Sequence, residues 1–135
     1  MIRLSRLADY AVVIMCQMAL NKGEITSSRA ISDRTKISEF TTIKILKTLT
    51  KNNLITSSRG ANGGYRLIKE PKEISILEIV KAIEAPVSLT ICSKPSVLDC
   101  KYNTNCIAKN GWQKINYELK KFLNNFTLTD FIKSY

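Results

Sequence analysis

The fold is decided by the stretch from Thr26 to Ile68, which reads TSSRAISDRTKISEFTTIKILKTLTKNNLITSSRGANGGYRLI. Its first part predicts a short helix over residues 26–35. Ser38, a residue type favoured at helix N-caps, then precedes a second predicted helix from Glu39 to Asn52. Apolar residues recur at helical spacing in that second helix, which predicts a buried face: they are Ile45, Leu46 and Leu49. Two short helices joined by a tight turn form a helix-turn-helix pattern.

The second half of the same stretch predicts a β-hairpin. Two β-prone segments, 54–58 and 65–68, flank a loop from Arg59 to Gly64 that holds three of the five glycines in the chain. Short strands around a glycine-containing turn are typical of a hairpin. A helix, a turn, a helix and a hairpin in this order predict a winged helix.

Helices are also predicted on both sides of this unit. Ser5 is a suitable N-cap for a first helix that ends near residues 21–23. Cys16 lies among apolar neighbours in that helix, and we interpret it as a small packing residue. Ser75 and Glu78 fit a capping box, which predicts a helix that reaches about Glu84.

The last predicted helix runs from about Ile107 to Asn124 and carries a narrow apolar stripe. The stripe has spacings of 3, 4, 3 and 4 residues and comprises Trp112, Ile115, Leu119, Phe122 and Phe126. Such a stripe suits packing against another helix. We expect it to pair with a second copy in a homodimer rather than to fold back on its own domain.

The chain is therefore expected to be mainly α with a small β-wing. It should contain a winged helix-turn-helix DNA-binding domain over 1–86, a cysteine-containing loop over 87–106, and a dimerisation helix with a C-terminal tail over 107–135.

Composition narrows the class of protein. Lys and Arg number 21 against 11 Asp and Glu, and the net charge of +10 favours an anionic partner, either nucleic acid or a membrane surface. No segment approaches the roughly 20 apolar residues that span a bilayer, and no signal-peptide pattern is present, so a cytoplasmic location is expected. The chain has no histidine, no phosphate-cradling loop opening a helix and no obvious carboxylate pair, so neither an enzyme nor a small-molecule substrate is expected.

The basic residues concentrate on the predicted helix-turn-helix and wing. Between Arg34 and Lys69 there are 8 basic residues and one acid, Glu39. A solvated surface would explain the pattern, but a surface that neutralises DNA phosphates explains it as well. The residues expected to contact double-stranded DNA are Ser38, Glu39, Thr41 and Ile43 at the base-reading end, Lys44 and Lys47 beside phosphates, and Arg59, Gly60, Gly63 and Gly64 in the wing. The arginine would enter a narrow minor groove.

Three cysteines, Cys92, Cys100 and Cys106, lie close together in a polar stretch. Thiolates are ligands for soft metal centres. Zinc sites favour short Cys-x₂₋₄-Cys pairs and four ligands, whereas seven and five residues intervene here. A thiol sensor that forms a disulfide on oxidation and an iron–sulfur cluster both tolerate such spacing. Spacing alone leaves these possibilities open.

Several segments together carry a resemblance to the IscR-type winged-helix regulators of iron–sulfur metabolism, and most nearly to the regulators of SUF-system cluster assembly. They are LSRLADYA from Leu4, RGANGGY from Arg59, ISILEI from Ile74, LTIC from Leu89, and NGWQKIN from Asn110, with Cys100 and Cys106. The resemblance implies a homodimeric transcription factor that controls iron–sulfur assembly genes. It also implies an iron–sulfur cluster, [2Fe–2S] in preference to [4Fe–4S], on Cys92, Cys100 and Cys106.

The resemblance also bears on the fourth ligand. In IscR a histidine lies three residues after the last cysteine, and Lys109, which cannot ligate, occupies that position here. In a nitric-oxide-sensing branch, an aspartate near the start of the first helix of the other protomer completes the site, and Asp9 matches it. A first-turn acid that stabilises the helix dipole is the simpler role for Asp9. A nitric-oxide sensor, a thiol-redox sensor and a cluster-free regulator of the same fold remain as alternatives.

Overall fold

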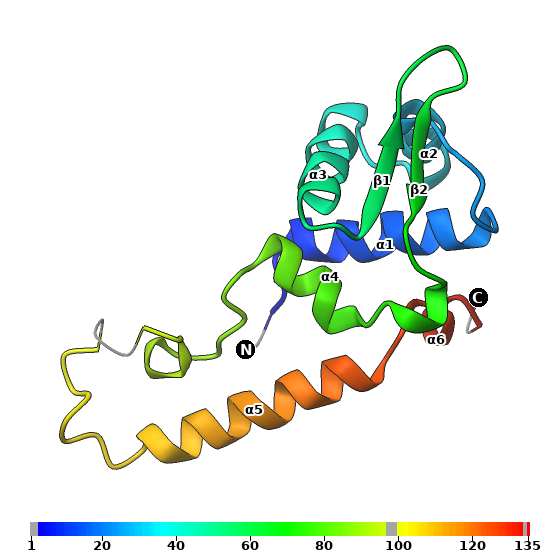
Figure 1. The fold of residues 1–135 in the computed structure, drawn as a ribbon. Coiled ribbons are helices and arrows are strands. Elements are labelled where there is room, and N and C mark those ends of the chain that lie inside the picture. Colours follow the sequence, from blue (N-terminus) through cyan, green and yellow to red (C-terminus); the bar gives the residue numbers. More distant parts are fainter. Residues whose placement is uncertain (1–2, 97–99, 134) are drawn as a thin grey trace.

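The computed structural model describes residues 3–96, 100–133 and 135, and it confirms the winged helix. Helices α2 (Ser28–Thr35) and α3 (Glu39–Lys51) form the helix-turn-helix, and strands β1 (Ile55–Ser58) and β2 (Gly64–Leu67) form the wing. The strands pair antiparallel from Ile55 opposite Leu67 to Ser58 opposite Gly64. Figure 1 shows the hairpin loop projecting beyond α2 and α3.

Side-chain caps and one left-handed residue fix the helix-turn-helix. The hydroxyl of Ser27 accepts a hydrogen bond from the Ala30 N–H at 3.2 Å and so begins α2. Lys36 ends α2 in the left-handed region at φ 62°, and its N–H bonds to the Ser32 carbonyl. The hydroxyl of Ser38 then caps α3 by accepting from the Thr41 N–H at 3.3 Å. The turn between the two helices is therefore set by local bonds.

The core lies between the helix-turn-helix and two supporting helices, α1 (Arg6–Leu20) and α4 (Ile76–Ile83). Ile14 and Met15 of α1 and Leu46 of α3 have no exposed surface. The predicted capping box is present: Ser75 and Glu78 bond to each other's backbone N–H groups at the start of α4. Burial alone would raise the pKa of Glu78, but the hydrogen bonds from Ser75 and Lys69 and the charge of Lys69 bring it below its ordinary value.

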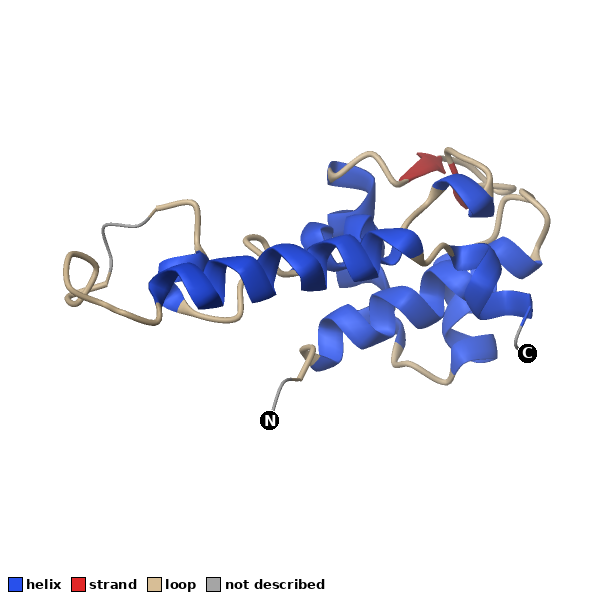
Figure 2. Ribbon diagram, turned by 90° about the horizontal axis from the view of Figure 1, so that it is seen from below, coloured by secondary structure: helices blue, strands red, loops and turns tan. Residues whose placement is uncertain are grey.

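Helix α5 (Lys109–Asn125) runs alongside α4 and carries the cysteine-containing segment at its far end (Figures 1 and 2). One face of α5 packs within the same chain. The buried Asn116 accepts a hydrogen bond from the Leu89 N–H at 3.0 Å, and Gln113 donates to the Cys92 carbonyl at 3.2 Å. These bonds attach the short 3₁₀ helix η2 (Ile91–Ser93) to α5.

A final helix, α6 (Leu128–Lys133), was not anticipated from the sequence, nor was the 3₁₀ turn η1 (Pro71–Glu73). The Leu128 N–H bonds to the Ile74 carbonyl at 3.1 Å, and the Ile76 N–H bonds to the Phe126 carbonyl at 2.8 Å. Leu128 is fully buried in the same core as α1. The chain after α5 therefore returns to the winged domain. In the described part of the chain, no helix has the length and apolar character needed to cross a membrane.

Candidate nucleic-acid interface and cysteine segment

The outer face of α3 is cationic and carries one exposed aromatic side chain. The predicted stripe Ile45, Leu46 and Leu49 is buried, and the opposite face presents Lys44, Lys47 and Lys51. None of these three lysines forms an ion pair with a described residue. Phe40 is 82% exposed at the start of the same face. The sequence places Phe40 at the base-reading end of this helix, although Phe40 is not one of the residues predicted to contact DNA.

The predicted base-reading residues lie at the N-terminal end of α3. The Ser38 hydroxyl donates to the Thr41 hydroxyl at 2.9 Å while it caps the helix, so both groups are engaged locally. Glu39 is exposed and Ile43 is half-buried. Together with Phe40, these side chains offer apolar and acceptor groups to the base edges of a major groove.

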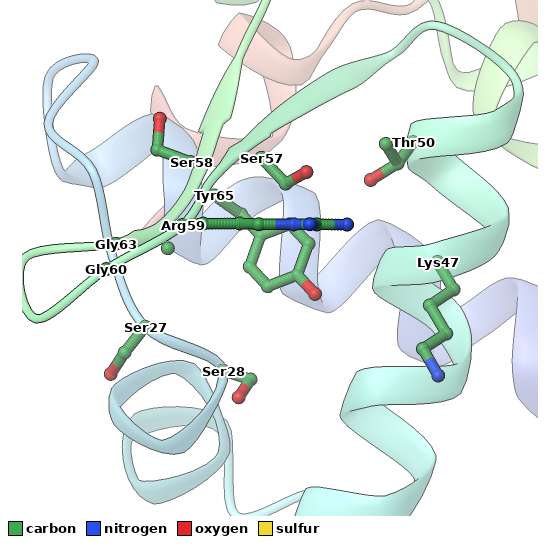
Figure 3. Close-up of a pocket in the computed structure, with 11 residues that line it drawn as sticks. Ser27, Ser28, Lys47, Thr50, Ser57, Ser58, Arg59, Gly60, Gly63 and Tyr65 are labelled. Carbon is green, nitrogen blue, oxygen red and sulfur yellow. The ribbon is translucent and has the colours of Figure 1, made fainter.

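A hollow separates the wing from α3, and we call it the wing hollow. Figure 3 shows the Arg59 side chain lying across it toward α3, with Lys47 and Thr50 on the far side. Ser27 and Ser28, at the start of α2, complete its rim together with Ser57, Ser58, Gly60, Gly63, Gly64 and Tyr65. Among the residues that the structure describes, the lining holds two cations and several hydroxyls but no carboxylate, a composition that suits phosphate oxygens. Arg59 points across this hollow, not outward from the tip of the wing.

All three wing glycines have structural reasons to be glycine, and a Cβ on Gly63 would lie 2.4 Å from the Ser58 carbonyl oxygen. A Cβ on Gly64 would lie 2.5 Å from the Thr26 carbonyl oxygen. Thr26 and Tyr65 exchange backbone hydrogen bonds at 2.8 and 2.9 Å, so the strand is held against Thr26. Gly60 instead has φ 107° with open space around it.

This difference predicts different costs for two alanine substitutions. Gly64→Ala must push β2 away from Thr26, and we expect it to lower the free energy of unfolding by about 2–3 kcal/mol. Gly60→Ala meets only backbone strain and should cost about 1 kcal/mol. Urea unfolding of the two variants beside the wild type measures both values. Equal losses would mean that the contact between Gly64 and Thr26 is not tight.

The cysteine segment places its three thiols in different surroundings. Cys92 in η2 is buried, and its sulfur lies 3.2 Å from the Thr90 hydroxyl oxygen. Cys100 and Cys106 are half-buried, and Cys106 lies three residues before α5. Across residues 3–96, 100–133 and 135, no three His, Cys, Asp or Glu side chains come close enough together to hold a metal ion. One described chain therefore does not by itself assemble the predicted site.

Asp9 and Cys16 lie on α1. Asp9 is exposed in the first turn, and the structure does not bring it together with the cysteines. Cys16 is half-buried against the core, and burial raises the pKa of its thiol. A thiol that stays protonated is a poor ligand, which agrees with the packing role predicted for Cys16.

A helix-turn-helix supported by α1 and α4, with a β-wing and an unpaired cationic recognition face, defines a winged-helix DNA-binding protein. Comparison with known proteins then gives the family. The chain belongs to the Rrf2 family, described as iron-dependent transcriptional regulators, whose model matches residues 4–134.

Curated relatives include the HTH-type transcriptional regulators IscR of Serratia proteamaculans and Escherichia coli O1:K1. Each is 32% identical to this chain over 98% of its length, and the match spans 80% and 81% of the respective relative. Such proteins are transcriptional regulators and not enzymes.

Solved structures agree with this assignment. IscR of T. potens has a TM-score of 0.74 at 26% identity, covering 98% of this chain and 88% of that one. CymR, the global cysteine regulator of B. subtilis, has a TM-score of 0.77 at 27% identity, covering 100% and 99%. An oxidized form of Staphylococcus aureus CymR has a TM-score of 0.69 at 25% identity, covering 97% and 96%.

Proposed function

We propose that the protein is a homodimeric regulator whose operator binding responds to an iron–sulfur cluster on Cys92, Cys100 and Cys106, and that it controls iron–sulfur assembly genes. The observation that carries the proposal is the position of the cysteines. All three lie in the segment that leads into α5, and α5 also bears an apolar stripe that the described residues of its own chain leave largely exposed. A group bound to these thiols would therefore lie next to the dimer helix.

The donor set supports a cluster. Three thiolates suit iron, and such clusters also accept ligands other than cysteine. Cys106 lies three residues before the 17-residue helix α5, so a group bound to its sulfur would lie at the N-terminal end of that helix. Asp9 of a second protomer is our proposed fourth ligand. When bound, the cluster supplies a centre that oxidants or nitric oxide can alter or remove.

The uncovered face of α5 supports a dimer. Ile115 and Phe122 are 51% and 58% exposed, and with Leu119 they line an apolar groove along the helix. Lys114, Glu118 and Lys121 form its rim, so the rim carries charges of both signs. The matching occupant is α5 of a second copy, whose stripe has the same apolar spacing and whose rim charges can pair with these.

Thiol-redox sensing is the second candidate, and two observations favour it. The described residues of one chain gather no metal site, and the similar CymR of S. aureus has been solved in an oxidized form. In this mechanism two of the three thiols form a disulfide and pass two electrons and two protons to a peroxide. The experiments in the Discussion separate the two candidates.

Arg59 provides a direct test of the DNA-binding surface. Arg59→Ala should weaken binding about tenfold and reduce the slope of log K against log [KCl] by about 1.8, because one phosphate contact is lost in each half-site of the dimer. The suitable control is Arg66→Ala, since neighbouring residues of a strand point to opposite faces and Tyr65 lines the wing hollow. Fluorescence anisotropy with a duplex selected by the wild-type protein from random sequences gives both quantities. An unchanged slope for Arg59→Ala would show that the wing hollow is not part of the DNA interface.

A further inference from the structure

A second hollow lies beside α3, and we call it the turn hollow. Its lining comes from three elements that are far apart in the sequence: the start of α1, the turn after α2 and the first turn of α3. Arg6 and Lys36 supply its two charges, and Ser38 and Thr41 supply hydroxyls. Neither cation was among the residues predicted from the sequence to contact DNA.

The turn hollow and the wing hollow lie on opposite sides of α3. Thr41 lines the first and Thr50 lines the second. These residues are nine positions apart, which is about two and a half turns of an α-helix, so their side chains point in opposite directions across the helix axis. The exposed face with Phe40, Lys44 and Lys47 lies between them.

This arrangement matches the geometry of a major groove. The groove is about 12 Å wide and is bordered by the phosphates of both strands. When α3 enters by its exposed face, each of its two sides comes near one strand. The wing hollow then faces the phosphates of one DNA strand, and the turn hollow faces the phosphates of the other.

The charges of the turn hollow also suit a phosphate. The described residues that line it include no carboxylate. The closest acids along the chain are Asp9, one turn after Arg6, and Asp33 and Glu39, three residues on either side of Lys36. Neither Arg6 nor Lys36 is in an ion pair with a residue that the structure describes, and both side chains are exposed.

The backbone at Lys36 is held in place, which matters for a binding residue. Lys36 occupies the left-handed C-cap of α2, its N–H bonds to the Ser32 carbonyl at 2.8 Å, and the Ser32 hydroxyl donates to the Ile37 carbonyl at 2.6 Å. The backbone that carries the Lys36 side chain is therefore fixed beside the first turn of α3, so little of it has to be ordered when DNA binds.

We propose that the turn hollow is a DNA phosphate site, in which Arg6 and Lys36 bind a backbone phosphate of the strand opposite the wing. The proposal rests on DNA binding through α3 and adds a contact from α1 to it. Phosphate contacts position a protein on DNA without reading its sequence. Arg6 and Lys36 thus contribute affinity and salt dependence but no sequence preference.

The test compares Arg6→Gln, Lys36→Gln and the double variant with Lys133→Gln, which removes one exposed charge from α6. Binding is measured over a range of KCl concentrations to the wild-type-selected duplex and to a shuffled duplex of the same composition. In a dimer each substitution removes one cation from both half-sites, so each single variant should reduce the salt slope by about 1.8, and the double variant by about 3.6. Affinity for both duplexes should fall by the same factor, and Lys133→Gln should match the wild type.

Three results would overturn the proposal. If the double variant keeps the wild-type salt slope, the turn hollow does not contact DNA, although DNA binding itself still stands. A fall confined to the selected duplex would make these residues readers of sequence. If the wild type binds neither duplex, both the DNA-binding function and the proposed phosphate site are contradicted. The charge-conserving variants Arg6→Lys and Lys36→Arg should keep the full slope, which separates loss of charge from damage to the fold.

Discussion

Replacing Cys92, Cys100 or Cys106 by alanine should abolish the brown colour and the bound iron of anaerobically purified protein. Each substitution removes one of three thiolate ligands, and a cluster left with two thiolates and a carboxylate is expected to be lost during purification. Visible absorbance and iron and sulfide analysis per chain provide the measurement.

Cys16→Ala is the matched control for these variants. Cys16 is also a cysteine, but it lies in α1 against the core with a raised thiol pKa, so its variant should keep the wild-type spectrum and iron content. A colourless, iron-free wild type from a strain able to make clusters would contradict the cluster proposal. Thiol titration before and after peroxide would then show whether two thiols are lost, as a disulfide switch requires.

Asp9→Ala examines the fourth ligand separately. If the carboxylate of the second protomer completes the site, the cluster of this variant should have an altered spectrum or be lost faster in air. Because Asp9 is exposed in the first turn of α1, its removal should change stability by only about 0.3–1 kcal/mol through the helix dipole. A spectrum and an air lifetime equal to those of the wild type would exclude Asp9 as a ligand.

The second large effect is expected from the apolar stripe of α5. The double variant Ile115→Glu, Phe122→Glu should convert a dimer into a monomer, because four carboxylates would have to be desolvated where two copies of α5 meet. Operator affinity should then fall at least about a hundredfold, since a monomer contacts one half-site instead of two. Sedimentation gives the oligomeric state, and fluorescence anisotropy gives the affinity.

Tyr117→Glu is the control for the stripe. Tyr117 is 63% exposed on the same helix but does not line the groove, so its variant should stay dimeric. All three side chains are exposed in the single chain, and their substitution should leave the fold of the winged domain intact. A double variant that sediments as a dimer would show that the stripe is not the interface.

Hydrogen bonds connect the cysteine segment to the DNA-binding domain, so a change at the cysteines can be transmitted to it. Gln113 and Asn116 of α5 hold the segment around Cys92, and the chain just after the C-terminal end of α5 is hydrogen-bonded through Phe126 and Leu128 to the chain at the start of α4. The Ser5 N–H additionally bonds to the Glu84 carboxylate at 2.6 Å, which joins the start of α1 to the end of α4. The cysteine segment is thus connected to both supporting helices of the winged unit.

Local chemistry was sufficient to predict most of the elements. The caps at Ser5, Ser38 and Ser75 and the glycine-rich turn are signals within a few residues, and the structure places helix starts and a hairpin at each. The spacing of apolar residues likewise identified the buried face of α3. The cysteines and the wing arginine stay predictions, made from residue types whose chemistry can be read without any knowledge of the fold.

Other features depended on contacts between distant segments, and these only the tertiary structure decided. Helix α6 has six residues and a weak pattern of its own, and it is held by the hydrogen bond from the Leu128 N–H to the Ile74 carbonyl and by the burial of Leu128. Gly64 must be glycine because of Thr26, thirty-eight residues earlier. Arg6 and Lys36 share a hollow because α1 packs beneath the helix-turn-helix. The sequence alone determined most of the elements, since caps and periodicity act over a few residues. The packing of the core decided which side chains contact each other, because it brings together residues that are far apart along the chain.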